Sequence, residues 1–297
     1  MEISFTRISF VNSINWVKLS FSSKKIPIYC VYPSEFLTPL ALGMLVAFAE
    51  QYEDGVLNED YLFVPGFFND WKELKRSIKK NGEGIVLFSN YVWNIKNQLY
   101  TSRLVKQKFP NCIIIHGGPS VPMDATPCAD YFGKNQEVDI VALGEGEITL
   151  AETLSIIAKC RSKSEQEFEN QLKMVDGIGF RDHKGSFFKS PKREVAKDPN
   201  IFPSPYLTGT FDVVRTWDLC TGTIETNRGC PFKCTYCSWR INQRPRHFDL
   251  ERIQKEIEWC GRNKLAIMYL ADANFGMYSR DVEIANMIVN TKKKYGY

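Results

Sequence analysis

Three cysteines lie close together in the stretch TNRGCPFKCTYCSWR. Cys230, Cys234 and Cys237 have the spacing C-x3-C-x2-C. Structural zinc sites need four protein ligands, and ferredoxin-type clusters also use four cysteines. His247 and Cys220 are the two candidates for a fourth ligand. Three thiolates on a cubane [4Fe–4S] cluster would instead leave one iron open to a substrate or cofactor.

The bulk composition is that of a globular protein that can bury a core. The chain has 297 residues, which suggests about two domains, and is 44% hydrophobic and 24% charged. A net charge of +4 is too weak to indicate binding to nucleic acid or to an acidic membrane surface. The first 25 residues contain no secretory signal, and no apolar run approaches the ~18 residues of a membrane span. We therefore expect the nine cysteines to lie in a reducing cytoplasm, where clustered thiols favour metal or redox chemistry.

The elements that must position the cysteines begin with an alternating half. Short apolar segments rich in β-branched or aromatic residues lie at 26–33, 61–66, 84–90, 112–118 and 138–144. Segments with helical spacing lie between and after them, at about 38–52, 70–80, 95–109 and 147–160. Strand followed by helix, repeated along the chain, predicts an α/β fold with a doubly wound parallel sheet. Ligands of such sheets bind outside the carboxyl ends of the strands.

A second unit is expected after a connecting region. Residues 161–176 are polar, 176–190 predict a small hairpin that turns at His183–Gly185, and 196–209 hold three prolines and predict an interdomain linker. A strand at 222–229 then leads into the cysteines. It is followed by a helix at 248–262 with Asp249 as its N-cap, a strand and exit loop at 265–276, and a helix at 280–297.

The cysteine segment GCPFKCTYCSW resembles the cluster motif of radical S-adenosylmethionine (SAM) enzymes. The resemblance implies that Cys230, Cys234 and Cys237 hold a [4Fe–4S] cluster, and that the amino and carboxylate groups of SAM chelate the fourth iron. It also implies that Tyr236 packs near the adenine. One electron from the cluster would cleave the sulfonium to a 5′-deoxyadenosyl radical. A zinc site is the alternative.

The segment YLADANFGM resembles the second-strand segment of the same superfamily. There, polar residues at the strand exit lie against the SAM amino group, and by position these are Asp272 and Asn274. The alternative is an ordinary strand-end turn that caps the next helix.

The alternating half resembles the cobalamin-binding domain that precedes some radical SAM barrels. The segments that carry the resemblance are PLALGMLVAFAE, LFSNYVWN, IIIHGGPSVP and VDIVALGEGEITLAETL. The resemblance implies that Ser89, Gly117 and Gly118 hold the nucleotide tail and phosphate of cobalamin. Paired glycines allow a close backbone approach, and helix N-termini favour phosphate. Glu145 and Glu147 lie in a further glycine-rich loop, GEGE.

One departure concerns the lower ligand of cobalt. Many cobalamin proteins carry D-x-H-x-x-G after the first strand, but here that loop reads YPSEFLTPLALG. We expect cobalt without a lower histidine ligand. His116 is a substitute candidate, although a histidine at a strand end is more often a hydrogen-bonded structural residue. Tyr91 and Trp93 either face the corrin or pack within the protein.

These observations predict four regions. They are an N-terminal extension (1–25), a Rossmann-like cobalamin-binding domain (26–160), a hairpin and proline-rich linker (161–221), and the N-terminal part of a radical SAM partial barrel (222–297). The barrel of this family has about six βα units and this chain reaches two. We therefore expect an incomplete second domain that binds a cluster poorly and turns over little by itself.

The predicted activity is a cobalamin-dependent radical SAM reaction, with methyl transfer to an unactivated carbon or phosphorus. The adenosyl radical would abstract a hydrogen atom and methylcobalamin would deliver the methyl group. The expected partners are a small-molecule or peptide substrate and an electron donor such as flavodoxin or ferredoxin, with no nucleic acid and no membrane. The alternatives are a non-methylating radical SAM enzyme with a vestigial cobalamin domain, and a non-catalytic metal-binding module.

Overall fold

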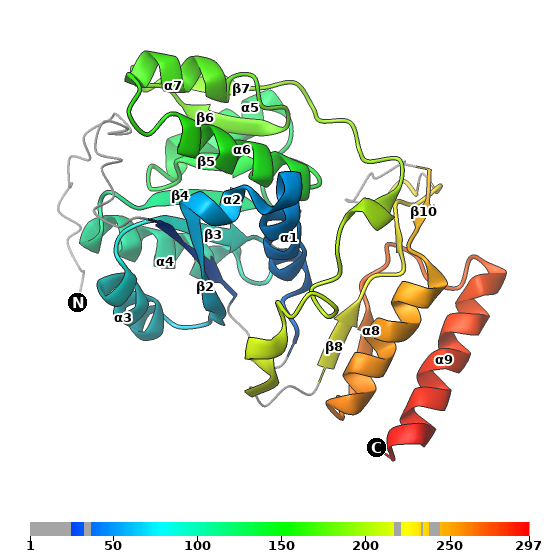
Figure 1. Cartoon of the computed structure of the whole chain (residues 1–297). Coiled ribbons are helices and arrows are strands. Elements are labelled where there is room, and N and C mark those ends of the chain that lie inside the picture. Colours follow the sequence, from blue (N-terminus) through cyan, green and yellow to red (C-terminus); the bar gives the residue numbers. More distant parts are fainter. Residues whose placement is uncertain (1–24, 33–36, 217–220, 233, 238–243, 297) are drawn as a thin grey trace, which may run out of the picture.

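The computed structural model describes residues 25–32, 37–216, 221–232, 234–237 and 244–296. In this part of the chain a large α/β unit is followed by a smaller unit that carries the cysteine loop (Figure 1). The proposed N-terminal extension lies, except for Lys25, outside the described residues.

The first unit is built on a seven-stranded sheet. Its strands are β1 (Ile26–Val31), β2 (Tyr61–Phe68), β3 (Ile85–Ser89), β4 (Ile113–Gly117), β5 (Ile140–Ala142), β6 (Ile178–Arg181) and β7 (Phe187–Lys189). They lie in the order β2-β1-β3-β4-β5-β6-β7, and the first five are parallel. This order confirms the predicted doubly wound parallel sheet. The strand order reverses between β1 and β3, and this switch point is where such sheets bind ligands.

The parallel strands are buried on both faces because helices cover both. The helices of this unit are α1 (Leu40–Gln51), α2 (Leu57–Asp60), α3 (Trp71–Asn81), α4 (Ile95–Lys108), α5 (Ala125–Lys134), α6 (Glu147–Lys159) and α7 (Glu165–Leu172), with a 3-10 turn at Tyr52–Gly55. On β1, Ile28 and Cys30 pack in the core of α1 and α6, while Tyr29 and Val31 pack in the core of α3 and α4. This alternation explains the continuous apolar runs of the sequence.

Three helices of the first unit, α2, α5 and α7, were not among those expected from apolar spacing, and α2 is a single turn of four residues. Helix α5 is short and contains Pro127 and Gly133, which weaken its helical pattern. Helix α7 lies in the segment predicted as a polar surface connection. It begins with a capping box at Ser164 and buries Phe168 and Leu172. Two apolar residues are enough to attach it to the core, but too few to give a clear period.

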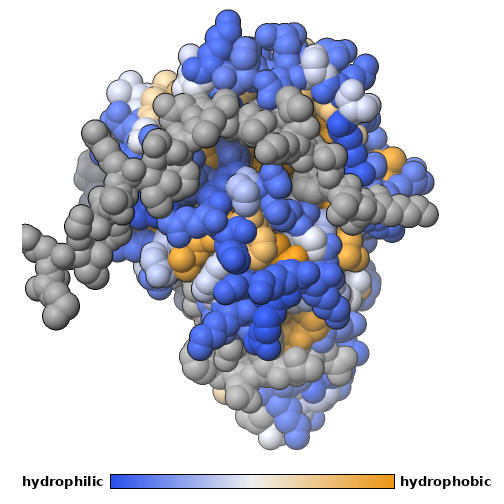
Figure 2. Space-filling view, turned by 90° about the vertical axis from the view of Figure 1, so that its left-hand side faces the viewer, coloured by the Kyte–Doolittle hydropathy of each residue, from blue (hydrophilic) through white to orange (hydrophobic). Residues whose placement is uncertain are grey.

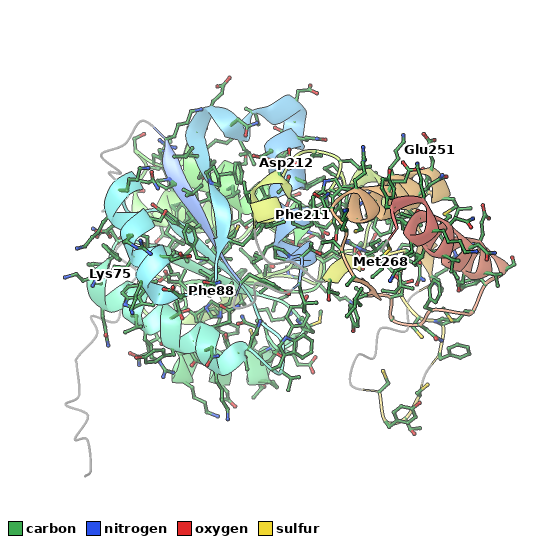
Figure 3. The ribbon with its side chains drawn as sticks, turned by 90° about the horizontal axis from the view of Figure 1, so that it is seen from below. Lys75, Phe88, Phe211, Asp212, Glu251 and Met268 are labelled. Carbon is green, nitrogen blue, oxygen red and sulfur yellow. The ribbon has the colours of Figure 1, made fainter. Side chains whose placement is uncertain are left out.

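The hairpin and the proline-rich segment are parts of the packed structure. β6 pairs with β5 and β7 in antiparallel fashion, so the hairpin extends the main sheet. The segment after it contains short 3-10 turns at Pro199–Ile201 and Asp212–Thr216. Its aromatic side chains Phe202, Tyr206 and Phe211 are at most 3% exposed. Figure 3 shows Phe211 between the sheet of the first unit and the helices of the second.

The second unit contains two βα repeats. Its elements are β8 (Thr221–Ile224), β9 (Asn227–Arg228), β10 (Arg246–His247), α8 (Leu250–Arg262), β11 (Ile267–Leu270) and α9 (Ser279–Tyr295). β8 and β11 pair in parallel, and β9 and β10 pair in antiparallel fashion at the base of the cysteine loop. Asp249 occupies the predicted N-cap of α8, but its side chain makes no capping hydrogen bond and instead accepts one from Asn200 at 3.3 Å.

The loop after β1 joins the two units directly. Leu37 forms a parallel bridge with Thr221, so this loop runs along the edge of β8. The Thr38 hydroxyl accepts a hydrogen bond from the Thr223 amide at 2.8 Å and lies 2.7 Å from the Tyr206 hydroxyl. Leu37 and Thr38 therefore extend the small sheet at the edge of β8.

The face of the molecule seen in Figure 2 is mostly hydrophilic where its atoms are coloured. Figure 2 shows one face, on which small apolar patches are separated by polar side chains. Within the described residues, no helix has both the length and the hydropathy required to cross a bilayer.

Phe211 provides a test of the shared core. Its ring packs 5.9 Å from that of Phe67 and 4.8 Å from that of Tyr206, centroid to centroid. Because the ring is completely buried, we expect Phe211→Ala to lower the free energy of unfolding by about 3–5 kcal/mol in urea titrations. Met174→Ala, at a side chain that is 78% exposed, is the control and should change it by less than about 0.5 kcal/mol. Similar effects of the two substitutions would contradict a core continuous across the units.

Candidate functional site

The carboxyl ends of the first sheet lie against the strand end that leads into the cysteines. Tyr91 follows β3, and Glu225 follows β8. Burial raises the pKa of Tyr91, a hydrogen bond with Ser89 lowers it, and Glu225 and Tyr269 of the second unit raise it. Glu147, the first residue of α6 after β5, has its carboxylate 2.6 Å from the guanidinium of Arg228. The cysteine loop therefore starts at the edge where doubly wound sheets bind ligands.

The three cysteines lie on an open loop. Gly229, just before Cys230, has a φ of 92°, a left-handed conformation that favours glycine. The Cys237 amide donates a hydrogen bond to the Cys234 carbonyl at 3.1 Å, which closes a tight turn. Cys234 is exposed, Cys230 and Cys237 are half-buried, and none of the three forms a disulfide.

The thiols fit a metal cluster by their chemistry but are not gathered around one point. Among the described residues, no three His, Cys, Asp or Glu side chains converge as a metal site. Accessible, unpaired thiols on one short loop are a suitable donor set for iron. Cys220, one of the candidates for a fourth ligand, lies outside the described residues.

His247, the other candidate for a fourth ligand, is part of the base of the loop. It lies on β10 opposite Asn227, and its ring packs edge-on against that of Tyr278 at 4.7 Å. Burial and Arg280 lower the pKa of His247, so its ring is neutral at pH 7. Its Nδ1 is buried without a hydrogen-bond partner among the described residues.

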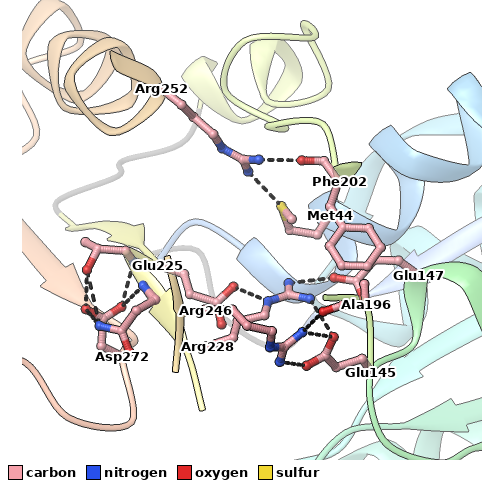
Figure 4. A network of polar contacts seen from close by, with 12 residues as sticks. Met44, Glu145, Glu147, Ala196, Phe202, Glu225, Arg228, Arg246, Arg252 and Asp272 are labelled. Carbon is pink, nitrogen blue, oxygen red and sulfur yellow. Dashed lines mark hydrogen bonds and ion pairs between the residues drawn. The ribbon is translucent and has the colours of Figure 1, made fainter. Parts of the chain in front are cut away.

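The residues predicted to contact SAM lie in different environments. Tyr236 is 89% exposed on the cysteine loop. Both carboxylate oxygens of Asp272 accept hydrogen bonds, from the amide and hydroxyl of Thr226 at 2.6 and 2.5 Å and from the amide and side chain of Asn227 at 3.2 and 3.0 Å. Asp272 thus fixes the corner between β8 and β9 (Figure 4). Asn274 is half-buried in the same exit loop.

The residues predicted to contact cobalamin lie together at the ends of β3 and β4. Ser89 pairs with Gly117 in the sheet register, and Gly118 follows directly. Gly118 has a φ of 92°, and a Cβ there would lie 2.7 Å from the backbone of Asn90, so the fold itself requires glycine. A Cβ at Gly117 would meet only ordinary contacts, at 3.6 Å or more. Asn90 adds a buried Oδ1 with no hydrogen-bond partner among the described residues, an acceptor that suits a polar ligand at this edge.

His116 is a structural residue in this fold. Its Nδ1 lies 2.8 Å from Asn90 Nδ2 and 3.0 Å from the Tyr131 hydroxyl, and its Nε2 lies 2.8 Å from the Ser102 hydroxyl. The side chain is completely buried, and burial lowers the pKa of His116 to about 3. Both ring nitrogens are already used, so His116 is not available as a metal ligand.

A half-buried tyrosine and an exposed tryptophan follow β3. The rings of Tyr91 and Trp93 stack 4.7 Å apart with an interplanar angle of 13°. Trp93 is 76% exposed and its neighbour Val92 is 82% exposed. An apolar group of this size beside a ligand-binding edge indicates a contact surface, not core packing.

Two arginines at the base of the cysteine loop were not predicted from the sequence. Arg228 and Arg246 are at most 10% exposed, and both contact Glu145 of the GEGE loop (Figure 4). Isolated arginines have no characteristic spacing, so only the pairing of β9 with β10 reveals that they lie side by side. The glycine-rich GEGE segment marks Glu145 and Glu147 in the sequence, but nothing in the sequence indicates that they bind these arginines.

Comparison with known proteins identifies homologues over most of the chain. It is 32% identical over 282 residues to the cobalamin-dependent radical SAM methyltransferase TokK of Streptomyces tokunonensis, covering 91% of this chain and 39% of that protein. It is 31% identical over 265 residues to the 2-(S-pantetheinyl)-carbapenam-3-carboxylate methyltransferase of Streptantibioticus cattleyicolor, covering 87% and 37%. The hopanoid C-3 methylase of Methylococcus capsulatus is 27% identical over 226 residues, covering 71% and 39%. The chain thus spans about two fifths of the length of these relatives. No protein-family model matches it.

The buried His116 predicts a pH dependence of stability. Its pKa falls from 6.5 to about 3 on folding, so between these values the unfolded chain binds a proton that the folded chain cannot. This contribution to stability is present above pH 6.5 and is lost as the pH falls toward 3. Between pH 7 and pH 5 we expect the wild type to lose about 2 kcal/mol more than His116→Gln in urea unfolding. Parallel pH profiles of the two proteins would show that His116 is protonated in the folded state.

Proposed function

The chain belongs to the radical SAM proteins that include cobalamin-dependent methyltransferases, and on this premise we propose that it takes part in methyl transfer to an unactivated carbon or phosphorus. The observation that supports this most is the position of the cysteine loop, which begins beside Arg228, where this residue contacts Glu145 and Glu147 at the carboxyl edge of the first sheet. Both cofactors would thus lie on the same side of the molecule.

The cysteine loop would bind the iron–sulfur cluster and SAM. Cys230, Cys234 and Cys237 would ligate a [4Fe–4S] cluster and leave one iron for the amino and carboxylate groups of SAM. Tyr236, exposed on the same turn, is free to pack against the adenine. Asp272 would act on the SAM amino group at most through Thr226 and Asn227, because they already occupy both of its oxygens. Asn274 has the more direct access.

The edge of the first sheet would bind cobalamin. Ser89 and Gly117 would contact the nucleotide tail and phosphate, and Asn90 Oδ1 would accept a hydrogen bond from a polar group of the ligand. Gly118 would shape this edge by keeping the loop against Asn90. The stacked rings of Tyr91 and Trp93 would cover one face of the corrin. No histidine of this chain is proposed as a lower cobalt ligand.

The protein would position these groups and exclude water from the space between them. When bound, the cluster and SAM supply one-electron chemistry that activates a carbon–hydrogen bond, and cobalamin supplies a transferable methyl group. Tyr91, which follows β3 of the first unit, and Tyr269, on β11 of the second, would border the space between the two cofactors. We propose that a small-molecule or peptide substrate binds there, and that a flavodoxin- or ferredoxin-like donor provides the electrons.

Metal analysis after anaerobic reconstitution tests the cluster. We expect about four irons and four sulfides per chain, because three thiolates hold the cubane cluster. Cys234→Ala should lose most of the iron, since two thiolates remain. Cys260→Ala, at a buried cysteine on α8, is the matched control and should keep the iron. One zinc and no iron in the wild type would overturn the proposed function in favour of a metal-binding module.

Gly117→Ala tests the cobalamin site with little disturbance of the fold. A Cβ at this position has room within the protein, so loss of ligand would reflect a blocked approach. We expect corrinoid absorbance to remain with the wild type through gel filtration, and Gly117→Ala to weaken the affinity on the order of tenfold. The control is Gly133→Ala, where a Cβ meets nothing within 4 Å. Absence of corrinoid from the wild type would instead support a vestigial domain.

A further inference from the structure

We infer that Glu145, acting through Arg228 and Arg246, is a positioning residue that fixes both ends of the cysteine loop to the first sheet. The inference deepens the proposed function, since the cysteine loop matters as the cluster site only if that function holds. Arg228 and Arg246 belong to the second unit, whereas Glu145 follows β5 of the first (Figure 4).

The two arginines mark the ends of the loop. Arg228 is the last residue of β9 and precedes Gly229 and Cys230, while Arg246 is the first residue of β10, where the loop returns. They lie directly opposite each other in the antiparallel pair. Contacts made by these two side chains therefore constrain the start and the end of the cysteine loop together.

One carboxylate binds both guanidinium groups. Arg246 Nη1 donates to Glu145 Oε2 at 3.1 Å, and its Nη2 donates to Glu145 Oε1. Arg228 Nη1 reaches the same Oε2 at 3.5 Å. Arg246 Nη1 also donates to the carbonyl of Ala196 at 2.7 Å, which ties the connecting segment to the same point.

Glu145 offsets the repulsion between the positive charges of Arg228 and Arg246. Two like charges directly opposite on paired strands repel each other. Here Glu147 and Glu225 also bind Arg228, at 2.6 and 2.9 Å, so that three carboxylates face two guanidinium groups. Among these three carboxylates only Glu145 contacts both arginines, so its removal would take a carboxylate from both nearly buried guanidinium groups at once.

The aromatic residues around Arg228 restrict where it can move. Its guanidinium lies 5.0 Å from the ring centroid of Phe202 and 5.6 Å from that of Phe248. Both rings are buried, which limits the alternative positions of the side chain. The two rings therefore help to hold the Arg228 guanidinium beside the carboxylates.

Hydrogen–deuterium exchange of the full chain tests the inference without any cofactor. Glu145→Gln should raise the exchange rate of the amides of residues 229–237 about tenfold, while the other elements of both units exchange as in the wild type. Glu152→Gln is the matched control, because Glu152 lies on α6 and binds a single arginine, Arg193, away from the loop. Arg246→Lys keeps the charge but loses the two-point contact, and should give an intermediate effect.

The outcomes separate positioning from general stability. Faster exchange confined to the loop in Glu145→Gln, and absent in Glu152→Gln, supports the inference. Unchanged loop exchange, or equal acceleration throughout both units, overturns it. If Glu145→Gln does not fold, Arg246→Lys provides the same test: faster exchange confined to the loop supports the inference, and unchanged or uniformly faster exchange overturns it.

A spectroscopic readout links the loop to the cluster. In protein reconstituted to equal iron content, Glu145→Gln should show a weaker SAM-induced change in the EPR signal of the reduced cluster than Glu152→Gln. An identical change in both variants would contradict a positioning role. A wild type that binds no iron would refute the proposed function, while the exchange experiment would still decide whether Glu145 holds the loop.

Discussion

The compensation of two nearly buried arginine charges is the constraint on which the arrangement of the units depends. Arg228 and Arg246 lie opposite each other at the base of the cysteine loop, and their mutual repulsion must be balanced where little water reaches them. Glu225 supplies one carboxylate from the same unit, and Glu145 and Glu147 supply the others from the first. Glu145 and Glu147 thus attach the base of the cysteine loop to the first unit by electrostatics.

The apolar core gives this contact a rigid support. The segment after the hairpin contributes Phe202, Tyr206 and Phe211, which are buried among residues of both units. The loop after β1 adds a bridge to β8 through Leu37. The proline-rich segment, which its prolines predict to be an interdomain linker, is therefore a packed layer between the units. The two cofactor sites proposed here would be held at a fixed separation by this layer.

Several residues that look functional in the sequence already have a structural role. Gly118 is required by the backbone of Asn90, His116 completes a buried hydrogen-bond network, and Asp272 fixes the corner before the cysteine loop. A structural role does not exclude contact with a ligand. It does mean that substitutions at these positions would disturb the fold together with the site, and that Gly117 and Glu145 are more informative positions for experiments.

The sequence by itself determined the doubly wound sheet, the positions of its first five strands and four of their helices along the chain, and the cysteine triplet as a cluster motif. These features depend on local spacing, because strands buried on both faces and loops between consecutive thiols leave a direct pattern in the chain. The tertiary structure alone decided that the hairpin extends the sheet, that Phe211 is core, and that Arg228 and Arg246 share Glu145. The contacts between Arg246 and Glu145 join residues about one hundred positions apart, and the sequence separation between such partners follows no period.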